Sequence, residues 1–268
     1  MKPKKCNWID AHPDVIQNAA HAARFARLCE ESARERHTKG EAGIGTLQEK
    51  RLHAVIKRFL HEDTAYHEVT LEGSRFVSDL RIGKEAFEVQ TGAFYPMKKK
   101  IAYYLEQTDC SVTVVHPVSV TKWTCRMDGE TGGFSPRRRV GGERPETVLA
   151  ELYAFLPYLG NPRLRVHLLL LETQDFRLPE GRGRRSATRR FERVPLALLG
   201  EMELYAPEDF RVFLPPELPA VFTVKELSRH TGLLGRDAYS AARTLQALGL
   251  VTPGEPSGRA MTFRRMDV

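Results

Sequence analysis

The sequence is poor in cysteine and has no long apolar run. Only four of its 268 residues are cysteines, and no two of them have the C-x-x-C spacing of a zinc knuckle. We therefore expect reduced structural thiols and no zinc site. No stretch reaches the roughly 18 apolar residues that a transmembrane helix needs, and no apolar run follows the first lysines. The sequence thus predicts a cytoplasmic protein with no signal peptide and no membrane partner.

Acidic residues are outnumbered by basic ones. The chain has 41 Lys and Arg against 34 Asp and Glu, a formal net charge of +7. Positive charge favours polyanionic partners, because their counterions are released on binding. Charge alone does not specify nucleic acid, since many basic proteins bind none. The hydrophobic share of 41 % is enough to build a folded core.

Hydrophobic periodicity and turn residues divide the chain into three parts. Residues 1–40 are predicted to form an N-terminal extension with one helix, at about 13–37. Residues 41–213 are predicted to form the main domain. A proline cluster, LPPELP at 214–219, marks a linker to a small domain over 218–268.

The main domain begins with a compact order of elements that predicts an α/β fold with a mixed sheet. Short connections join a helix, three strands, a helix and a strand. Their expected bounds are 47–61 for the helix, 65–71 for a strand, 75–91 for a hairpin, 96–107 for the second helix and 111–118 for the last strand.

Farther on, a helix is expected at 146–159 and a strand at 164–172. The strand is a continuous apolar run, which is typical of a strand buried on both faces. The stretches 121–145 and 177–193 are rich in arginine and glycine and are expected to be basic loops.

The hairpin contains the most informative residues. Glycine at the first position of a two-residue turn suits a type II′ turn, which places Gly83 at the tip. Leu80 then lies opposite Phe87, and Asp79 lies opposite Glu88. Because strand side chains alternate between faces, the first pair points into the core and the second pair to the other face.

Two carboxylates so placed have Cβ atoms about 5 Å apart and repel each other. A divalent cation between Asp79 and Glu88 relieves the repulsion, and Mg²⁺ or Mn²⁺ would keep positions open for water and phosphate. Gln90 shares their face. The alternative is an acidic pair on the wet face of an exposed hairpin.

A third carboxylate belongs to the helix at 47–61. Glu49 lies three residues before Leu52 and seven before Ile56, so it shares the apolar face of that helix. It therefore joins the candidate metal site. Alternatively it only caps the helix, as the partner of Thr46 in a capping box.

Asp79, then Glu88-Val89-Gln90 after a short hairpin, then a helix and a strand, resemble the PD-(D/E)XK nuclease superfamily. The resemblance covers about residues 46–118. It implies a restriction endonuclease-like αβββαβ core in which Asp79 and Glu88 bind Mg²⁺ or Mn²⁺. It also implies that Glu49 is the acid contributed by the first helix.

The sequence departs from this family pattern at two positions. Gln90 stands where the family has lysine, which is similar to an E-x-Q variant, and Ser78 stands where it has proline. Glutamine cannot supply the positive charge that orients the attacking water. Lys98 or Lys99, on the next helix, could supply it, although a run of lysines is also typical of a solvated helix face.

Residues 218–268 resemble a winged-helix DNA-binding domain, with the order helix, turn, helix and two strands. On the longer helix Arg236, Arg243 and either Tyr239 or Ser240 share an outer face, as in a recognition helix. Five apolar residues are predicted to pack inward: Ala238, Ala241, Ala242, Leu245 and Leu248.

These features together predict a metal-dependent DNA endonuclease. The resemblance also implies that two copies can pair as a homodimer, since nucleases of this type often do so to cut two strands, but no sequence feature fixes an interface. The arginines of the two expected loops would hold the DNA backbone, unless those loops are only charged and solvated. They are Arg137, Arg138, Arg139, Arg184 and Arg185. Two alternatives remain: a catalytically inactive DNA-binding protein, and a module that binds other proteins.

Overall fold

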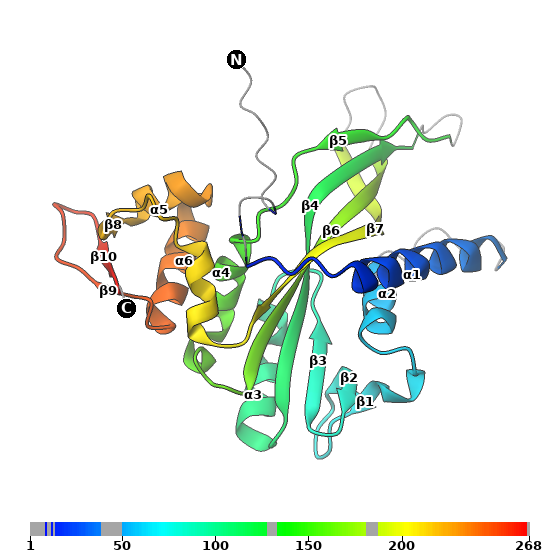
Figure 1. The fold of residues 1–268 in the computed structure, drawn as a ribbon, viewed down its shortest axis with the longest axis horizontal. Helices are drawn as coiled ribbons and strands as arrows, with labels where there is room; N and C mark the ends of the chain where they lie inside the picture. Colours follow the sequence, from blue (N-terminus) through cyan, green and yellow to red (C-terminus); the bar gives the residue numbers. More distant parts are fainter. Residues whose placement is uncertain are drawn as a thin grey trace. The chain divides into compact units, whose positions relative to one another are not determined.

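The fold is described from a computed structural model of the chain (Figure 1). The structure describes residues 9, 12, 14–38, 50–127, 133–180 and 187–266. The chain forms two compact units, each built from separate segments. Unit 1 comprises Met1–His67, His116–Arg144 and Leu169–Met202, and unit 2 comprises Glu68–Val115, Pro145–Leu168 and Glu203–Val268.

The protein has an α/β fold with a large mixed sheet, as expected. The strand order is β1-β2-β3-β4-β6-β7, and β5 pairs with β4. Strands β2 and β3 are antiparallel whereas β3 and β4 are parallel, so the sheet is mixed. The strands are β1 (His67–Thr70), β2 (Val77–Ile82), β3 (Glu85–Val89), β4 (Ser111–Arg126), β5 (Arg138–Val140), β6 (Leu164–Glu180) and β7 (Ala187–Leu204).

In unit 1, helices α1 (Ala19–Thr38) and α2 (Lys50–Leu60) pack against each other (Figure 1). Phe25 and Phe59 meet edge to face, with ring centroids 5.3 Å apart. The predicted apolar face of α2 is confirmed, since Leu52, Val55, Ile56 and Phe59 are buried.

The predicted start of α1 near residue 13 is wrong. The helix begins at Ala19 because the side chain of Asn18 accepts hydrogen bonds from the N–H groups of Ala20 and His21, at 2.9 and 3.2 Å. A side-chain acceptor at this position satisfies N–H groups that have no partner inside the helix.

In unit 2 the predicted hairpin register is confirmed. Leu80 pairs with Phe87, and Ile82 pairs with Glu85. Gly83 has a φ of 59° while Lys84 keeps a negative φ, which is the pattern of a type II′ turn. Leu80 is buried, as expected for the core face of β2. Helix α3 (Lys98–Gln107) follows a short 3-10 helix, η3 (Tyr95–Met97).

The last part of unit 2 has a second sheet, of order β8-β10-β9, and two helices. These elements are β8 (Val221–Thr223), α5 (Val224–Thr231), α6 (Gly235–Ala247), β9 (Val251–Pro253) and β10 (Thr262–Arg265). Helix α5 begins with a capping box, in which the Thr223 hydroxyl accepts from the N–H of Glu226 and the Glu226 carboxylate accepts from the N–H of Thr223. Gly249, with a φ of 74°, follows the end of helix α6. The five residues predicted to pack inward on α6 are all buried.

Helix α4 (Thr147–Glu151) and the 3-10 helix η4 (Leu152–Tyr158) both pack against α6. A further 3-10 helix, η5 (Pro207–Phe213), precedes β8, and η2 (Thr64–Tyr66) precedes β1.

The prediction of basic loops at 121–145 and 177–193 is wrong for most of the described residues. Strand β4 continues to Arg126 and β6 to Glu180, and β7 begins at Ala187. The many arginines interrupt the alternation of apolar and polar residues that would predict a strand. The long side chain of arginine can nevertheless lie along a sheet. Arg177 of β6, for example, donates to the hydroxyl and the carbonyl oxygen of Thr188 at 2.8 and 2.6 Å.

Among the described residues, no helix has the length and apolar character needed to span a membrane.

Candidate active site

Asp79 and Glu88 lie on neighbouring strands of unit 2. Leu80 pairs with Phe87 in this antiparallel pair of strands. Asp79, the residue before Leu80, therefore lies opposite Glu88, the residue after Phe87. Glu88 is only 2 % exposed, whereas Asp79 is half-buried. One oxygen of Asp79, Oδ2, accepts a hydrogen bond from the N–H of Val89 at 2.8 Å. The two carboxylates therefore share one face of the hairpin, as predicted.

Helix α3 supplies two partners for the buried carboxylate of Glu88. The hydroxyl of Tyr104 donates to Oε1 at 2.6 Å, and the ammonium group of Lys100 forms an ion pair with Oε2. Lys100 and Tyr104 are four residues apart, so they lie on the same face of the helix. Lys100 also donates to the carbonyl oxygen of Val77. The lysine thereby links the helix to both strands of the hairpin.

The surroundings of Glu88 change its proton affinity. Burial raises the pKa of Glu88 to about 7; Lys100 opposes this shift and the charge of Asp79 adds to it. The carboxyl group is therefore poised to gain or lose a proton near neutral pH, where an ordinary glutamate is fully ionised. Burial, followed by the nearby charge of Glu88, raises the pKa of Tyr104, so the phenol keeps its proton.

The lysine that reaches the acidic pair is not one of the two expected. Lys98 and Lys99 are exposed, and Lys100 is the lysine of α3 that contacts Glu88. The reason is helix geometry: Lys100 precedes the buried Ile101 and lies one turn before the buried Tyr104. This spacing is visible in the sequence and was the signal that could have selected Lys100.

Gln90 follows β3 and is half-buried. Its backbone N–H donates to the carbonyl oxygen of Val115 at 2.9 Å, and its side-chain amide donates to the carbonyl oxygen of Ala93 at 2.5 Å. The amide group thus holds the loop after β3. In this conformation its NH₂ group is engaged by the backbone.

Two of the three carboxylates predicted to bind the metal, Asp79 and Glu88, are among the described residues. Glu49 lies outside the described residues. Within the described part of the chain, no group of three or more His, Cys, Asp or Glu side chains converges. Two carboxylates are a set that Mg²⁺ accepts, since it takes one or two and completes its shell with water and phosphate oxygens. Both oxygens of Glu88 already have protein partners in Tyr104 and Lys100, so a metal would have to share or replace those contacts.

The residues predicted to bind DNA are found in both units. In unit 1, Arg137 precedes β5, Arg138 and Arg139 belong to it, and all three are exposed. Arg184 and Arg185 lie outside the described residues.

On helix α6 of unit 2, Arg236 and Tyr239 are exposed and Arg243 is half-buried. Ser240 is only 7 % exposed, so of the two alternatives Tyr239 is the one on the outer face. The predicted outer face of α6 is thus present, although helix α4 and η4 cover another side of the same helix.

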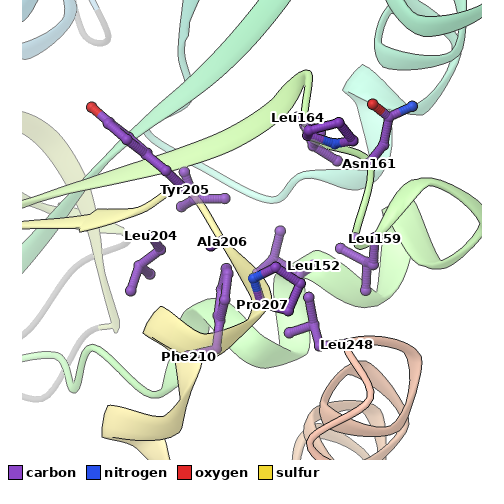
Figure 2. A pocket seen from close by; sticks show the side chains of 13 residues that line it. Leu152, Leu159, Asn161, Leu164, Leu204, Tyr205, Ala206, Pro207, Phe210 and Leu248 are labelled. Atoms are coloured by element: carbon purple, nitrogen blue, oxygen red, sulfur yellow. The ribbon is translucent and has the colours of Figure 1, made fainter.

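Unit 2 also contains an apolar hollow of about 120 Å³ (Figure 2). It is lined by leucine side chains, among them Leu152, Leu159 and Leu248, and by Pro207 and Phe210. None of the described residues that line it is acidic or basic. The hollow therefore lacks the groups needed for hydrolysis, and the acidic pair remains the candidate for chemistry.

Comparison with known families gave one match. Residues 50–205 match the family described as "Domain of unknown function (DUF8091)". The match includes the hairpin, helix α3 and strands β4 to β6. The searches of curated proteins and of solved structures found no match.

Proposed function

The chain belongs to the DUF8091 family, and we propose that it is a metal-dependent DNA endonuclease. In this proposal the α2 to β4 region is a restriction endonuclease-like core, with Asp79 and Glu88 as ligands of Mg²⁺ or Mn²⁺ and Glu49 as a third acid. The bound metal would supply an activated water and would offset charge on the cleaved phosphodiester.

The observation that carries the proposal is the contact of Lys100 with Glu88. The resemblance to PD-(D/E)XK nucleases lacks a lysine at residue 90, and Lys100 brings an ammonium group to the same acidic pair from the next helix. Its side chain is 17 % exposed, so it borders solvent while Glu88 is buried. A cation so placed can orient a water and stabilise an anionic transition state.

Glu88 and Asp79 divide the remaining work in this proposal. Asp79 is half-buried, and its Oδ2 accepts the N–H of Val89. Glu88 is the buried member of the pair, and its carboxylate is held by Lys100 and Tyr104. Tyr104 fixes the orientation of the Glu88 carboxylate.

We further propose that β8 to β10 with α5 and α6 form a winged-helix module that contacts DNA. The element order β8-α5-α6-β9-β10, the buried inner residues of α6 and the exposed Arg236 and Tyr239 support this assignment.

The test is cleavage of duplex, branched and single-stranded DNA with Mg²⁺ or Mn²⁺. Glu88→Gln is expected to abolish cleavage, and Lys100→Met to slow it at least about a hundredfold. Glu85→Gln is the matched control, because Glu85 lies on the same strand and its side chain is 54 % exposed. This variant should cleave like the unmodified protein. Absence of cleavage by the unmodified protein on all three substrates would contradict the proposal.

A second candidate function is DNA binding without catalysis. It is favoured by the fact that both oxygens of Glu88 already have protein partners. Calorimetric titration with Mn²⁺ separates the two functions. Heat that depends on Asp79 supports the enzyme, whereas DNA binding without any metal signal supports the inactive alternative.

A further inference from the structure

The strands of unit 1 carry a surface rich in aromatic and arginine side chains, and this surface does not include Asp79 or Glu88. Trp123 of β4 is half-buried, and the guanidinium of Arg137 lies over its ring, 4.5 Å from the ring centroid. Arg139 is the direct partner of Trp123 in the β4–β5 register. Side chains of directly paired residues point to the same face, so Arg139 lies beside the indole ring.

More aromatic residues belong to the same face. Because side chains alternate along a strand, residues 123, 125 and 127 point to the same face. Phe134 forms an isolated antiparallel bridge with Met127, so it belongs to this face as well. Phe134 is 51 % exposed and meets Phe176 of β6 edge to face, at 5.1 Å. Met127 lies four residues after Trp123 along the strand, a span of roughly 13 Å. This face therefore offers two aromatic platforms in one row, with arginines next to one of them.

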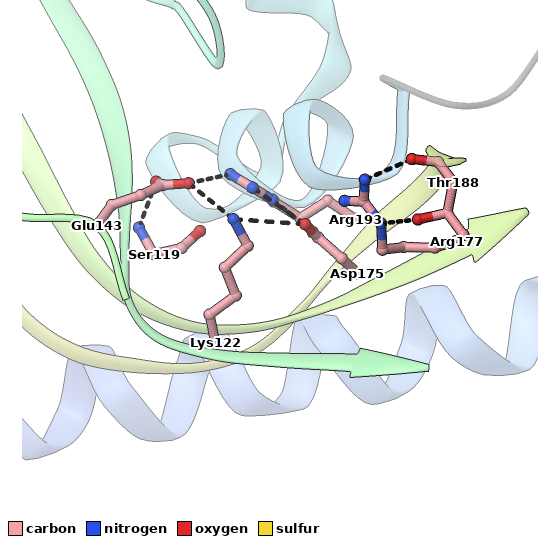
Figure 3. A network of polar contacts seen from close by, with 7 residues as sticks. All are labelled: Ser119, Lys122, Glu143, Asp175, Arg177, Thr188 and Arg193. Carbon is pink, nitrogen blue, oxygen red and sulfur yellow. Dashed lines mark hydrogen bonds and ion pairs between the residues drawn. The ribbon is translucent and has the colours of Figure 1, made fainter. Parts of the chain in front are cut away.

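The opposite face of the same strands has a different character (Figure 3). There Lys122, Glu143, Asp175 and Arg193 form a closed ion-pair network, with contacts between 2.7 and 3.5 Å. Burial alone would raise the pKa of Asp175 and of Glu143, but Arg193 and Lys122 hold both pKa values below the ordinary range. These acids are therefore ionised and matched by cations of the network, so they do not offset the exposed arginines.

Exposed arginine is abundant on these strands. Arg137 and Arg139 are exposed beside Trp123, whereas the exposed Arg126 and Arg138 belong to the opposite face of the same strands. The carboxylate of Glu172 accepts the indole N–H of Trp123 at 2.5 Å. This hydrogen bond holds the edge of the indole, and the guanidinium of Arg137 covers part of the ring, so a base would stack on the indole and the arginine together.

We infer that the Trp123–Arg137–Arg139 face of unit 1 binds single-stranded nucleic acid, with bases stacked on Trp123 and Phe134 and phosphates held by the arginines. Charge complementarity selects a polyanion, and the flat rings select a polyanion whose bases are free to stack. In a duplex the base faces are already stacked on one another, so a ring on a sheet cannot reach them. The inference adds to the proposed function by naming the strand form that the protein holds, and it does not depend on catalysis.

The experiment uses the intrinsic fluorescence of Trp123. The chain has two tryptophans, so a Trp8→Phe background leaves Trp123 as the sole reporter. Titration with an oligo-dT of about 12 nucleotides, a length within the usual range of such sites, should quench the emission at low salt. A duplex of equal length should bind at least about tenfold more weakly. Oligo-rU of equal length distinguishes DNA from RNA as the natural ligand.

Three variants test the geometry, with a labelled oligo-dT as the reporter. Trp123→Ala should weaken binding about 5- to 150-fold, the range found for loss of one stacked base, and Trp123→Phe should recover part of the loss. Arg139→Ala should lower the slope of log affinity against log salt by about 0.7. Arg126→Ala is the matched control, because Arg126 is exposed and lies between Cys125 and Met127 on β4, so it belongs to the opposite face. It removes the same charge from the neighbouring strand and should leave affinity nearly unchanged.

The outcomes separate this inference from the proposed nuclease. Glu88→Gln should bind oligo-dT like the unmodified protein, so loss of cleavage and loss of binding are independent results. Equal weakening by Arg126→Ala and Arg139→Ala would overturn the inference, since it would indicate charge without a specific face. So would the absence of quenching at low salt, or unchanged affinity of a folded Trp123→Ala variant.

Discussion

Both units bury carboxylates between strands, but they treat the charge in opposite ways. In unit 1, Asp175 and Glu143 share two cations, Arg193 and Lys122, and their pKa values are lowered. In unit 2, Glu88 has one cation, Lys100, and burial raises its pKa to about 7.

The difference shows that burial alone does not decide how reactive a carboxylate is. Asp175 is 1 % exposed and Glu88 is 2 % exposed, so both carboxylates are almost entirely removed from solvent. Burial raises the pKa of each; two cations outweigh it at Asp175, whereas one cation does not at Glu88, where the charge of Asp79 adds to the effect of burial. A balanced network is suited to stabilising a fold, whereas an unbalanced acid is suited to binding a cation or moving a proton.

The largest expected effect concerns the balanced network of unit 1. Arg193→Met leaves Asp175 buried without its main partner, which costs about 3–5 kcal/mol in the free energy of unfolding. Urea denaturation measures this loss. The double variant Arg193→Met with Asp175→Leu should be less destabilised than the single one, because no unpaired charge then remains buried. A single variant as stable as the unmodified protein would show that the network is not what stabilises these strands.

The second effect is a pH dependence that differs in direction between the two regions. The pKa of Glu88 is about 7 in the folded protein and near 4.5 in the unfolded chain. The folded state therefore binds the extra proton between these values, and the stability it contributes is lost as the pH rises from about 4.5 to about 7. The loss is about 3 kcal/mol.

The measurement is the difference in unfolding free energy between the unmodified protein and Glu88→Gln across this window. Asp175→Asn is the comparison, because the lowered pKa of Asp175 gives a contribution that is constant there and lost only in acid, as the pH falls below about 3.8. Parallel pH profiles for the two variants would remove the contrast between the regions.

The smallest effect concerns an exposed ion pair that serves as a reference for both regions. Lys84 and Asp109 pair with side chains 75 % and 70 % exposed. Asp109 raises the pKa of Lys84, and Lys84 lowers the pKa of Asp109. Water and salt nevertheless screen such an exposed pair, so it contributes little to stability. Asp109→Asn should leave the melting temperature unchanged within error at 0.15 M salt. A large drop would mean that burial is not what separates the two buried clusters from ordinary surface pairs.

Local sequence patterns predicted the parts of the fold that depend on near neighbours. Glycine at residue 83 set the turn, and the turn set the register that brings Asp79 opposite Glu88. Thr223 with Glu226 marked the start of α5 in the same way. These features could be predicted because a turn or a cap is fixed by side chains a few residues apart.

What the sequence determined by itself is therefore the α/β class, the hairpin and the acidic pair. The helical spacing of Lys100 and Tyr104 could have singled out Lys100, but only the tertiary structure showed that this side of α3 lies against Glu88. It also decided that arginine-rich segments continue β4, β6 and β7 and that Arg193 and Asp175 neutralise each other there. The physical reason is that burial and ion pairing join residues far apart in the chain, and both depend on distances that periodicity does not contain.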